Sequence, residues 1–299
     1  MASFKSWIKA FRLRTLPLAL SVILTGSFLA IQDGVCNWWI IGLSLLTTLF
    51  LQVLSNLAND YGDSLKGTDN NERVGPRRTV QSGEISRESM KKAIIIFASL
   101  SLLSGVALLY FSFGDNFKLS LLFLIMGLAS IWAAVKYTVG DNAYGYFGLG
   151  DLFVFVFFGL VGVVGSYFLN THALSAEVFL PASAMGLFSA GVLNLNNMRD
   201  IDNDIRSGKH TMASRLGIVD AKKYHLTLII IGWILLLVWM MLQKHHPERL
   251  ILLVALPFFL FDLFKVLHTK EKPALDPYLR KLALKTLLIA LLFGVSILL

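Results

Sequence analysis

The sequence predicts an all-α integral membrane protein with nine transmembrane helices. Of its 299 residues, 56% are hydrophobic, and the mean hydropathy is +0.67. Soluble domains rarely reach such values, so the bilayer is the expected solvent. The apolar residues form nine segments, each long enough to cross a hydrocarbon core of about 30 Å. The segments are residues 16–32, 38–58, 93–112, 117–137, 150–169, 177–197, 224–243, 249–267 and 281–298.

These segments leave almost nothing for a soluble domain, so residues 1–299 are expected to form one transmembrane domain. The single cysteine, Cys36, excludes an intramolecular disulfide. The basic N-terminal residues and the apolar stretch after them resemble a signal peptide. The stretch is long, however, and lacks a clear small-residue cleavage site, so we expect a retained first helix.

Lys and Arg residues are distributed unequally along the chain. With the N-terminus inside, 24 of the 27 lie in cytoplasmic segments, and only Lys118, Lys244 and Arg249 fall on the other side. This bias predicts that the N-terminus and two long polar loops, 59–92 and 198–223, face the cytoplasm. The net charge of +8 therefore fits lipid headgroups and topology, and nucleic acid is not an expected partner.

Two acidic stretches, each following a hydrophobic segment, mark the candidate site. One begins at Asn59 and continues to Asp69, and the other runs from Arg199 to Asp204. Residues four apart share one face if the helices continue through these stretches. Oxygen ligands on one face suit Mg²⁺, which binds one or two carboxylates together with phosphate oxygens. The predicted metal ligands are Asn59, Asp63, Asp200 and Asp204. The bland alternative is that these acids only solvate helix ends.

Basic residues close to both stretches supply the charge complement of a diphosphate. Arg77, Arg78 and Lys209 are candidates for binding it, and Lys66, inside the first stretch, is a candidate catalytic residue, as is Tyr137. Arginine can grip phosphate through two hydrogen bonds, whereas lysine acts as a point charge. The alternative is that these residues only follow the positive-inside rule. Together, the acids and bases predict an integral membrane enzyme that acts on a lipid diphosphate.

A weak internal repeat supports this interpretation. Asn56-Leu57-Ala58-Asn59 ends the second segment, and Asn194-Leu195-Asn196-Asn197 ends the sixth. The spacing fits two parallel four-helix repeats plus one extra helix, with the site between the halves. Asn56 and Asn196 join the candidates for binding the diphosphate. Chance similarity of two helix ends is the alternative.

The loop after the fourth segment contains further candidates. Tyr137 could hydrogen-bond a diphosphate or belong to an interfacial aromatic belt. Asp151 could cap a helix or take part in catalysis. The aromatic run from Phe153 to Phe158 could line a prenyl tunnel or shield a carbocation, although lipid-facing packing is the simpler interpretation.

The sequence resembles the UbiA superfamily of intramembrane prenyltransferases over nearly the whole chain. Within that superfamily, it is most similar to the branch that uses 1,4-dihydroxy-2-naphthoate in menaquinone synthesis. The stretches that carry the resemblance are Arg14-Thr15-Leu16-Pro17, residues 59–69, Val80-Gln81-Ser82-Gly83, residues 148–159, residues 199–211 and Leu216-Gly217. Asp141-Asn142 departs from the Gly and Pro that relatives often have there, and Arg12-Leu13-Arg14 lacks an expected proline.

The resemblance implies a nine-helix bundle with a central cavity, open laterally to lipid and capped by cytoplasmic loops. It also implies an Mg²⁺-dependent enzyme of the bacterial cytoplasmic (inner) membrane. That enzyme would transfer a polyprenyl group from polyprenyl diphosphate to 1,4-dihydroxy-2-naphthoate, releasing diphosphate and CO₂ and giving demethylmenaquinol. Asp60 or Asp69 could be the base that deprotonates the acceptor.

Two alternatives remain at the level of sequence. Another acceptor, such as 4-hydroxybenzoate, homogentisate, chlorophyllide or haem, would use the same ionisation chemistry. A cation-coupled transporter would also need acids, but transport acids usually lie near the bilayer midplane on broken helices. The acids of this chain lie at predicted cytoplasmic helix ends, which favours diphosphate chemistry.

Overall fold

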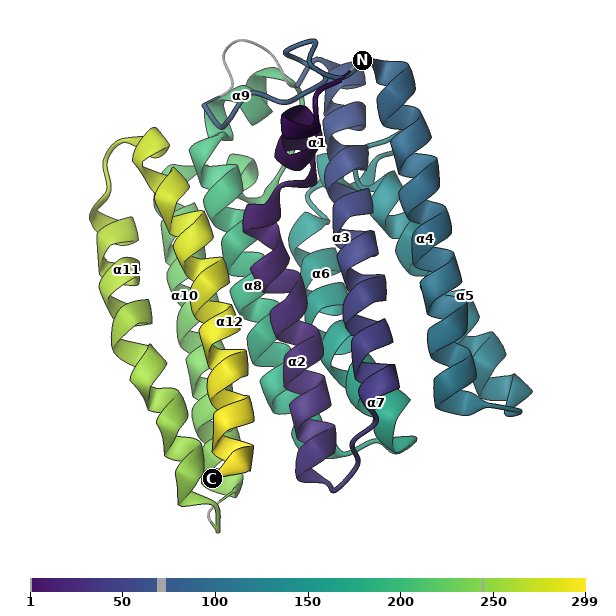
Figure 1. The fold of residues 1–299 in the computed structure, drawn as a ribbon. Helices are drawn as coiled ribbons and strands as arrows, with labels where there is room; N and C mark the ends of the chain where they lie inside the picture. Colours follow the sequence, from purple (N-terminus) through teal and green to yellow (C-terminus); the bar gives the residue numbers. More distant parts are fainter. Residues whose placement is uncertain (1, 69–73, 244) are drawn as a thin grey trace.

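The protein is an elongated bundle of helices, described for residues 2–68, 74–243 and 245–299 in a computed structural model (Figure 1). Within these ranges no strand is formed. The longest helices are α2 (Leu16–Gln32), α3 (Trp38–Lys66), α4 (Arg87–Phe113), α5 (Phe117–Lys136), α8 (Phe179–Arg199), α10 (Met212–Leu242), α11 (Leu256–His268) and α12 (Asp276–Leu298). The short helices are α1 (Phe4–Phe11), α6 (Gly150–Val154), α7 (Gly165–Thr171) and α9 (Ile201–Arg206). A π-helix, η3 (Phe155–Val164), joins α6 to α7, and 3₁₀ turns are η1 (Leu13–Thr15), η2 (Tyr144–Phe147), η4 (Ala176–Val178), η5 (Pro247–Ala255) and η6 (Lys272–Leu275).

Eight segments of the described chain are long and apolar enough to cross a membrane. They coincide with the first eight predicted segments, and the chain is an integral membrane protein. The ninth predicted segment, residues 281–298, lies within α12, a helix of 23 residues.

The two polar loops are shorter than predicted because the flanking helices extend into them. Helix α3 continues to Lys66, so the first acidic stretch lies in its last turns. Ser86 and Thr211 act as N-caps, which lets α4 and α10 begin early. At Asp200 the chain bends between α8 and α9, yet the Asp204 N–H still bonds to the Asp200 carbonyl at 2.9 Å. Both stretches are therefore largely helical.

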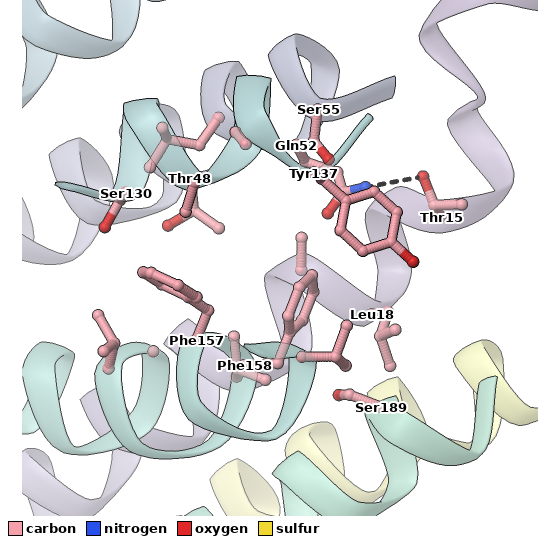
Figure 2. Close-up of a pocket in the computed structure, with 18 of the residues that line it drawn as sticks. Thr15, Leu18, Thr48, Gln52, Ser55, Ser130, Tyr137, Phe157, Phe158 and Ser189 are labelled. Carbon is pink, nitrogen blue, oxygen red and sulfur yellow. Dashed lines mark hydrogen bonds between the residues drawn. The ribbon is translucent and has the colours of Figure 1, made fainter. Parts of the chain in front are cut away.

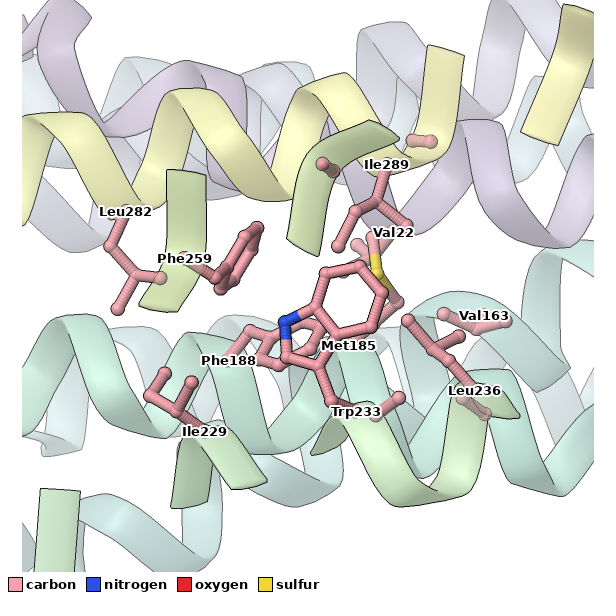
Figure 3. Close-up of a cluster of buried hydrophobic side chains, with 14 of the residues drawn as sticks. Val22, Val163, Met185, Phe188, Ile229, Trp233, Leu236, Phe259, Leu282 and Ile289 are labelled. Carbon is pink, nitrogen blue, oxygen red and sulfur yellow. The ribbon is translucent and has the colours of Figure 1, made fainter. Parts of the chain in front are cut away.

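The main core lies between α8, α10, α11, α12 and α2 (Figure 3). Trp233 and Phe259 meet edge to face with their ring centroids 5.3 Å apart, and Phe188 lies 4.9 Å from Phe259. Gly232 permits this packing, because an added Cβ would lie 2.5 Å from the Phe188 ring. The aromatic cluster packs the middle of α8 against α10 and α11.

The other side of the bundle is looser. Helix α5 packs against α4 and α3 at one edge (Figure 1), and almost none of its apolar stretch is buried. Opposite it, η3 touches α8 so closely that a Cβ on Gly159 would lie 2.8 Å from the Ala182 carbonyl oxygen. A cavity remains between the α3–α5 side and the η3–α8 wall.

Candidate functional site

A cavity of about 430 Å³ runs between α2, α3, α4, α5, η3 and α8. This volume lies in the range of sites that bind small molecules. Its polar lining includes Arg12, Arg14, Asn56, Asn59, Asp63, Arg78, Tyr137, Asn196, Asp200, Asp204, Lys209 and Arg280. Its apolar lining includes Leu18, Val22, Val106, Leu109, Phe123, Phe153, Phe157, Phe158, Val161 and Leu169. The cavity thus has a charged end and a long part lined by aliphatic and aromatic side chains.

Figure 2 shows part of this lining. Phe157 and Phe158 of η3 form one wall, and Thr48 and Ser130 lie on the opposite wall. Tyr137 lies toward the end where Gln52 donates a hydrogen bond to the Thr15 hydroxyl at 3.3 Å.

The first acidic stretch presents Asn59 and Asp63 to the cavity. Asp63 is only 4% exposed, and the Tyr146 hydroxyl donates a hydrogen bond to its Oδ1 at 2.8 Å. Between them Gly62 lies under the next loop, because a Cβ there would come within 2.7 Å of the Thr138 carbonyl. The Thr138 hydroxyl bonds to Asn59 Oδ1 at 3.2 Å. The loop after α5 therefore fixes both residues from above.

The second acidic stretch presents Asn196, Asp200 and Asp204 to the same cavity. Arg199 holds Asp200 through two bonds, Nε to Oδ1 at 3.0 Å and Nη2 to Oδ2 at 2.6 Å. The same guanidinium donates to Asn196 Oδ1 at 2.9 Å and to the carboxylate of Asp276. Two predicted site residues thus share one buried arginine.

The structure divides the predicted basic residues into two groups. Arg78 and Lys209 are buried and line the cavity, with Lys209 Nζ 3.9 Å from Asp63 Oδ1. Arg77 is exposed and does not line it, although its chain neighbour does. Lys66 also lies off the cavity, with its Nζ 4.0 Å from the centroid of the Tyr146 ring.

Asp60, one of the two candidate bases, does not line the cavity. Its carboxylate is 1% exposed, lies outside the cavity lining, and accepts hydrogen bonds from the Thr79 N–H at 3.1 Å and hydroxyl at 2.6 Å. Asp60 points about 100° from Asn59 and about 60° from Asp63 around the helix axis, and its side chain turns to Thr79 instead of entering the cavity. Asp60 therefore anchors the segment that carries Arg78. The other predicted base, Asp69, lies outside the described residues.

Tyr137 and Asn56 line the cavity as predicted for contacts with a ligand. Burial raises the pKa of Tyr137, and the charges of Asp151, Asp63 and Asp204 raise it further. Its phenol therefore stays protonated at neutral pH and can donate a hydrogen bond. Asn56 instead donates its amide to Thr15 at 3.0 Å and to the Phe11 carbonyl, which fastens the α1–α2 junction.

Sequence reasoning assigned no site role to several residues that the fold brings in. Arg12, Arg14 and Arg280 line the cavity, and Tyr146 and Arg199 hold its carboxylates. Arg14 begins one of the stretches that carried the family resemblance, and Arg12 lies just before it. Tyr146 and Arg199 could not be found from sequence. Neither is an acid or part of a ligand pattern, and their contacts with the carboxylates arise only in the folded chain.

The donor set fits a metal ion that is bound together with a diphosphate. In the part of the chain that the structure describes, no three His, Cys, Asp or Glu side chains come close enough to ligate one ion alone. Mg²⁺ needs only one or two carboxylates when phosphate oxygens and water complete its shell. Asn59, Asp63, Asp200 and Asp204 line one cavity and can supply such partial sets from its two sides.

Comparison with known proteins agrees with this geometry. The model of the UbiA prenyltransferase family matches residues 19–295. The 1,4-dihydroxy-2-naphthoate octaprenyltransferase of Escherichia coli is 41% identical over 98% of this chain and 95% of its own length. The protein of the same name from Mycobacterium tuberculosis is 34% identical, over 97% and 96%.

Solved structures share the fold. A UbiA homolog from Aeropyrum pernix K1 has a TM-score of 0.69 at 16% identity, covering 96% of this chain and 98% of that one. A UbiA homolog from Archaeoglobus fulgidus bound to GPP and Mg²⁺ has a TM-score of 0.63 at 18% identity, covering 96% and 99%.

Proposed function

Because the chain belongs to the UbiA prenyltransferase family, we propose that it transfers a polyprenyl group from polyprenyl diphosphate to 1,4-dihydroxy-2-naphthoate. The reaction releases diphosphate and CO₂ and forms demethylmenaquinol, a step of menaquinone biosynthesis. One observation carries the proposal: a single cavity joins an end lined by both acidic stretches to a long apolar wall. A lipid diphosphate likewise has a charged headgroup at one end and a long apolar chain attached to it.

The charged end would hold the diphosphate. Arg78 and Lys209 contribute positive charge in a buried setting, where electrostatic attraction is stronger than in water. Asn59, Asp63, Asp200 and Asp204 would hold Mg²⁺, which, when bound, stabilises the negative charge of the leaving diphosphate. The protonated phenol of Tyr137, which lines the cavity, would donate a hydrogen bond at this end.

The apolar wall would bind the prenyl chain and protect the reactive intermediate. The allylic C–O bond breaks with its electron pair leaving on the diphosphate, so the prenyl group becomes an allylic cation. Aromatic faces attract cations, and Phe153 and Phe157 line the cavity with their ring centroids 6.1 Å apart. The surrounding aliphatic side chains exclude the water that would otherwise capture the cation.

The acceptor then attacks the cation through the ring carbon that bears its carboxylate. A C–C bond forms between this ring carbon and the prenyl group. The C–C bond to the carboxylate then breaks, CO₂ leaves, and the electron pair of the broken bond restores the aromatic ring. Asp60 is not assigned to this step, since its carboxylate binds Thr79 and lies off the cavity.

The membrane arrangement is part of the proposal. Helix α12 would be the ninth span, and residues 1–299 would form one domain built of two four-helix repeats and this extra helix. The N-terminus and the charged end of the cavity would face the cytoplasm from a bacterial inner membrane, capped by the loops there. The distribution of Lys and Arg supports this orientation.

The test is an assay of the purified protein in nanodiscs with Mg²⁺, polyprenyl diphosphate and one of two acceptors. With 1,4-dihydroxy-2-naphthoate, mass spectrometry should find a prenylated naphthoquinone without the carboxyl group, and EDTA should abolish it. Product from 4-hydroxybenzoate alone would keep the chemistry and overturn the acceptor. No product with either acceptor, from folded protein, would overturn the proposed function.

A further inference from the structure

Tyr146 lies at the charged end of the cavity but belongs to neither acidic stretch. It is part of the η2 turn between α5 and α6 and is 7% exposed. The side chain does not line the cavity. It lies behind the groups that do, so any effect on a ligand must pass through them.

The hydroxyl of Tyr146 connects two residues of the first acidic segment. It donates to Asp63 Oδ1 at 2.8 Å and lies 2.6 Å from the Thr68 hydroxyl. A phenol has one proton to donate, so the Thr68 hydroxyl must be the donor in the second bond. A hydrogen bond to an ionised carboxylate is short and strong. It fixes the orientation of Asp63 before a ligand arrives.

The ring of Tyr146 attracts two ammonium groups. Lys66 Nζ lies 4.0 Å from the ring centroid, and Lys209 Nζ lies 5.2 Å from it. Both distances fall within the range of about 6 Å over which a cation is attracted to an aromatic face. The ring therefore lowers the cost of holding Lys209 close to the diphosphate end while a second positive charge lies nearby.

The backbone around Tyr146 ties three segments together. The His210 N–H donates to the Tyr146 carbonyl at 3.0 Å, and Asn203 donates to the Thr68 carbonyl at 2.8 Å. Gly148 allows the close approach, since its φ is +74° and a Cβ would lie 2.9 Å from the His210 carbonyl oxygen. The segments after α3, α5 and α9 thus meet at this one tyrosine.

We propose that Tyr146 is a positioning residue for the metal–diphosphate site. Its hydroxyl orients Asp63, and its ring holds Lys209 at the edge of the cavity. The inference rests on the proposed function, because it concerns the site at which the prenyl diphosphate binds. It predicts that loss of Tyr146 weakens the handling of metal and diphosphate and leaves binding of the aromatic acceptor intact.

Two substitutions separate the hydroxyl from the ring. Tyr146→Phe removes the hydrogen bonds of the hydroxyl with Asp63 and Thr68, and Tyr146→Leu also removes the aromatic face near Lys66 and Lys209. Tyr110→Phe is the matched control, because Tyr110 is 72% exposed on the apolar surface of α4. Each protein is assayed for its half-saturating Mg²⁺ concentration and for the KM of farnesyl diphosphate and of the acceptor. Binding of farnesyl thiodiphosphate in the presence of Mg²⁺ is measured by calorimetry and does not depend on turnover.

In Tyr146→Phe, the half-saturating Mg²⁺ concentration and the Kd of farnesyl thiodiphosphate should rise about tenfold, the scale of one hydrogen bond to a charged group. In Tyr146→Leu both should rise further, while the acceptor KM of Tyr146→Phe stays at the wild-type and Tyr110→Phe values. If Tyr146→Leu does not fold, Tyr146→Phe alone decides.

Unchanged Mg²⁺ dependence and analogue binding in Tyr146→Phe would overturn the inference. A rise in the acceptor KM by the same factor would also overturn it, because it would show a general loss of site structure and not a specific effect on metal and diphosphate. An inactive wild-type protein that binds no analogue would instead mean that the proposed function is wrong.

Discussion

Arg199 and Asp200 are adjacent in the chain and form a buried ion pair with two hydrogen bonds. The bonds join Nε to Oδ1 at 3.0 Å and Nη2 to Oδ2 at 2.6 Å. The same guanidinium contacts Asp276 at the first residue of α12. A Cβ on Gly75 would lie 2.6 Å from Arg199 Nη2, so the segment before α4 that contains Gly75 packs directly against the pair. The position of Asp200 in the cavity therefore depends on α12 and on this segment.

Removal of Arg199 should be severely destabilising. Breaking a buried ion pair from one side leaves an uncompensated charge and costs about 3–5 kcal/mol. Arg199→Ala should therefore lower the unfolding midpoint strongly, and Arg199→Lys less so, since lysine keeps the charge but not the planar fork. Thermal unfolding in a mild detergent measures both. The control is Lys272→Ala, which breaks a surface pair with Asp202 expected to contribute at most about 1 kcal/mol. Equal midpoints for Arg199→Ala and Lys272→Ala would contradict the prediction.

The two acidic stretches contain carboxylates that line the cavity and one that is exposed, so the effects of removing them can be compared. Asp63→Ala and Asp200→Ala should each lower turnover by about a hundredfold or more, the scale seen when a group that stabilises transition-state charge is lost. Asp202 lies between the cavity residues of the second stretch but is exposed and pairs with Lys272. Asp202→Ala should keep turnover within about twofold, as surface changes usually do. Similar losses in Asp202→Ala and Asp200→Ala, measured by the same product assay, would mean that the stretch acts only through its net charge.

Asp60→Asn tests which of the neighbouring acids does chemistry. The amide oxygen of asparagine can still accept the hydrogen bonds from the Thr79 N–H and hydroxyl. A residue that only anchors this segment should therefore tolerate the change, and kcat should stay within about fivefold of wild type. A catalytic base would lose its function, because an amide cannot take up the proton. A kcat reduced to the level of Asp63→Ala would restore Asp60 as the base.

The contrast between Asp60 and Asp63 shows what the sequence could reveal. Spacing of four residues placed Asn59 with Asp63 and Asp200 with Asp204, and these residues do line one cavity. The positions of the spans followed from hydropathy, because segment length and composition decide whether a helix crosses a bilayer. Which acid of a stretch faces the cavity depends on how the helix is rotated about its axis. The sequence does not give this rotation, and it follows only from the packing of α3, which continues to Lys66.

Residues in loops were harder to predict. Arg77 and Arg78 are indistinguishable by sequence, yet only the second points into the cavity, because the segment is anchored through Thr79 to Asp60. Tyr146 reaches Asp63 across 83 positions in the sequence. Neither a propensity nor a spacing rule carries such information, since it arises from how the turn after α5 lies on the end of α3.

Tyr137 allows a prediction about pH. Burial and the nearby carboxylates raise its pKa from the ordinary value of 10, so the phenol stays protonated throughout the range from pH 6 to 9. Tyr137→Phe should therefore lower kcat/KM by one constant factor, about tenfold for a hydrogen bond to a charged group, at every pH in that range. The two pH profiles of kcat/KM should be parallel. A basic limb that disappears in Tyr137→Phe would show that the phenol titrates and would contradict the raised pKa.

The apolar length of the cavity should discriminate among prenyl chains. Gly127, Ser130, Ile131 and Ala134 form one face of α5 along the cavity, and a Cβ on Gly127 would meet no atom within 4 Å. Gly127 precedes Tyr137 by ten positions, which corresponds to about 15 Å along the helix axis. A bulky side chain there would meet a long prenyl chain but not a short one.

Gly127→Leu should therefore spare geranyl diphosphate and impair octaprenyl diphosphate. Crowding that costs about 1–3 kcal/mol lowers kcat/KM for the long substrate by about fivefold to 150-fold. The ratio of the two kcat/KM values is the measurement, because it cancels any general loss of folded enzyme. Gly42→Leu is the control, since Gly42 is exposed on α3, has open space around it and does not line the cavity. An unchanged ratio in Gly127→Leu would place the prenyl chain along a different wall.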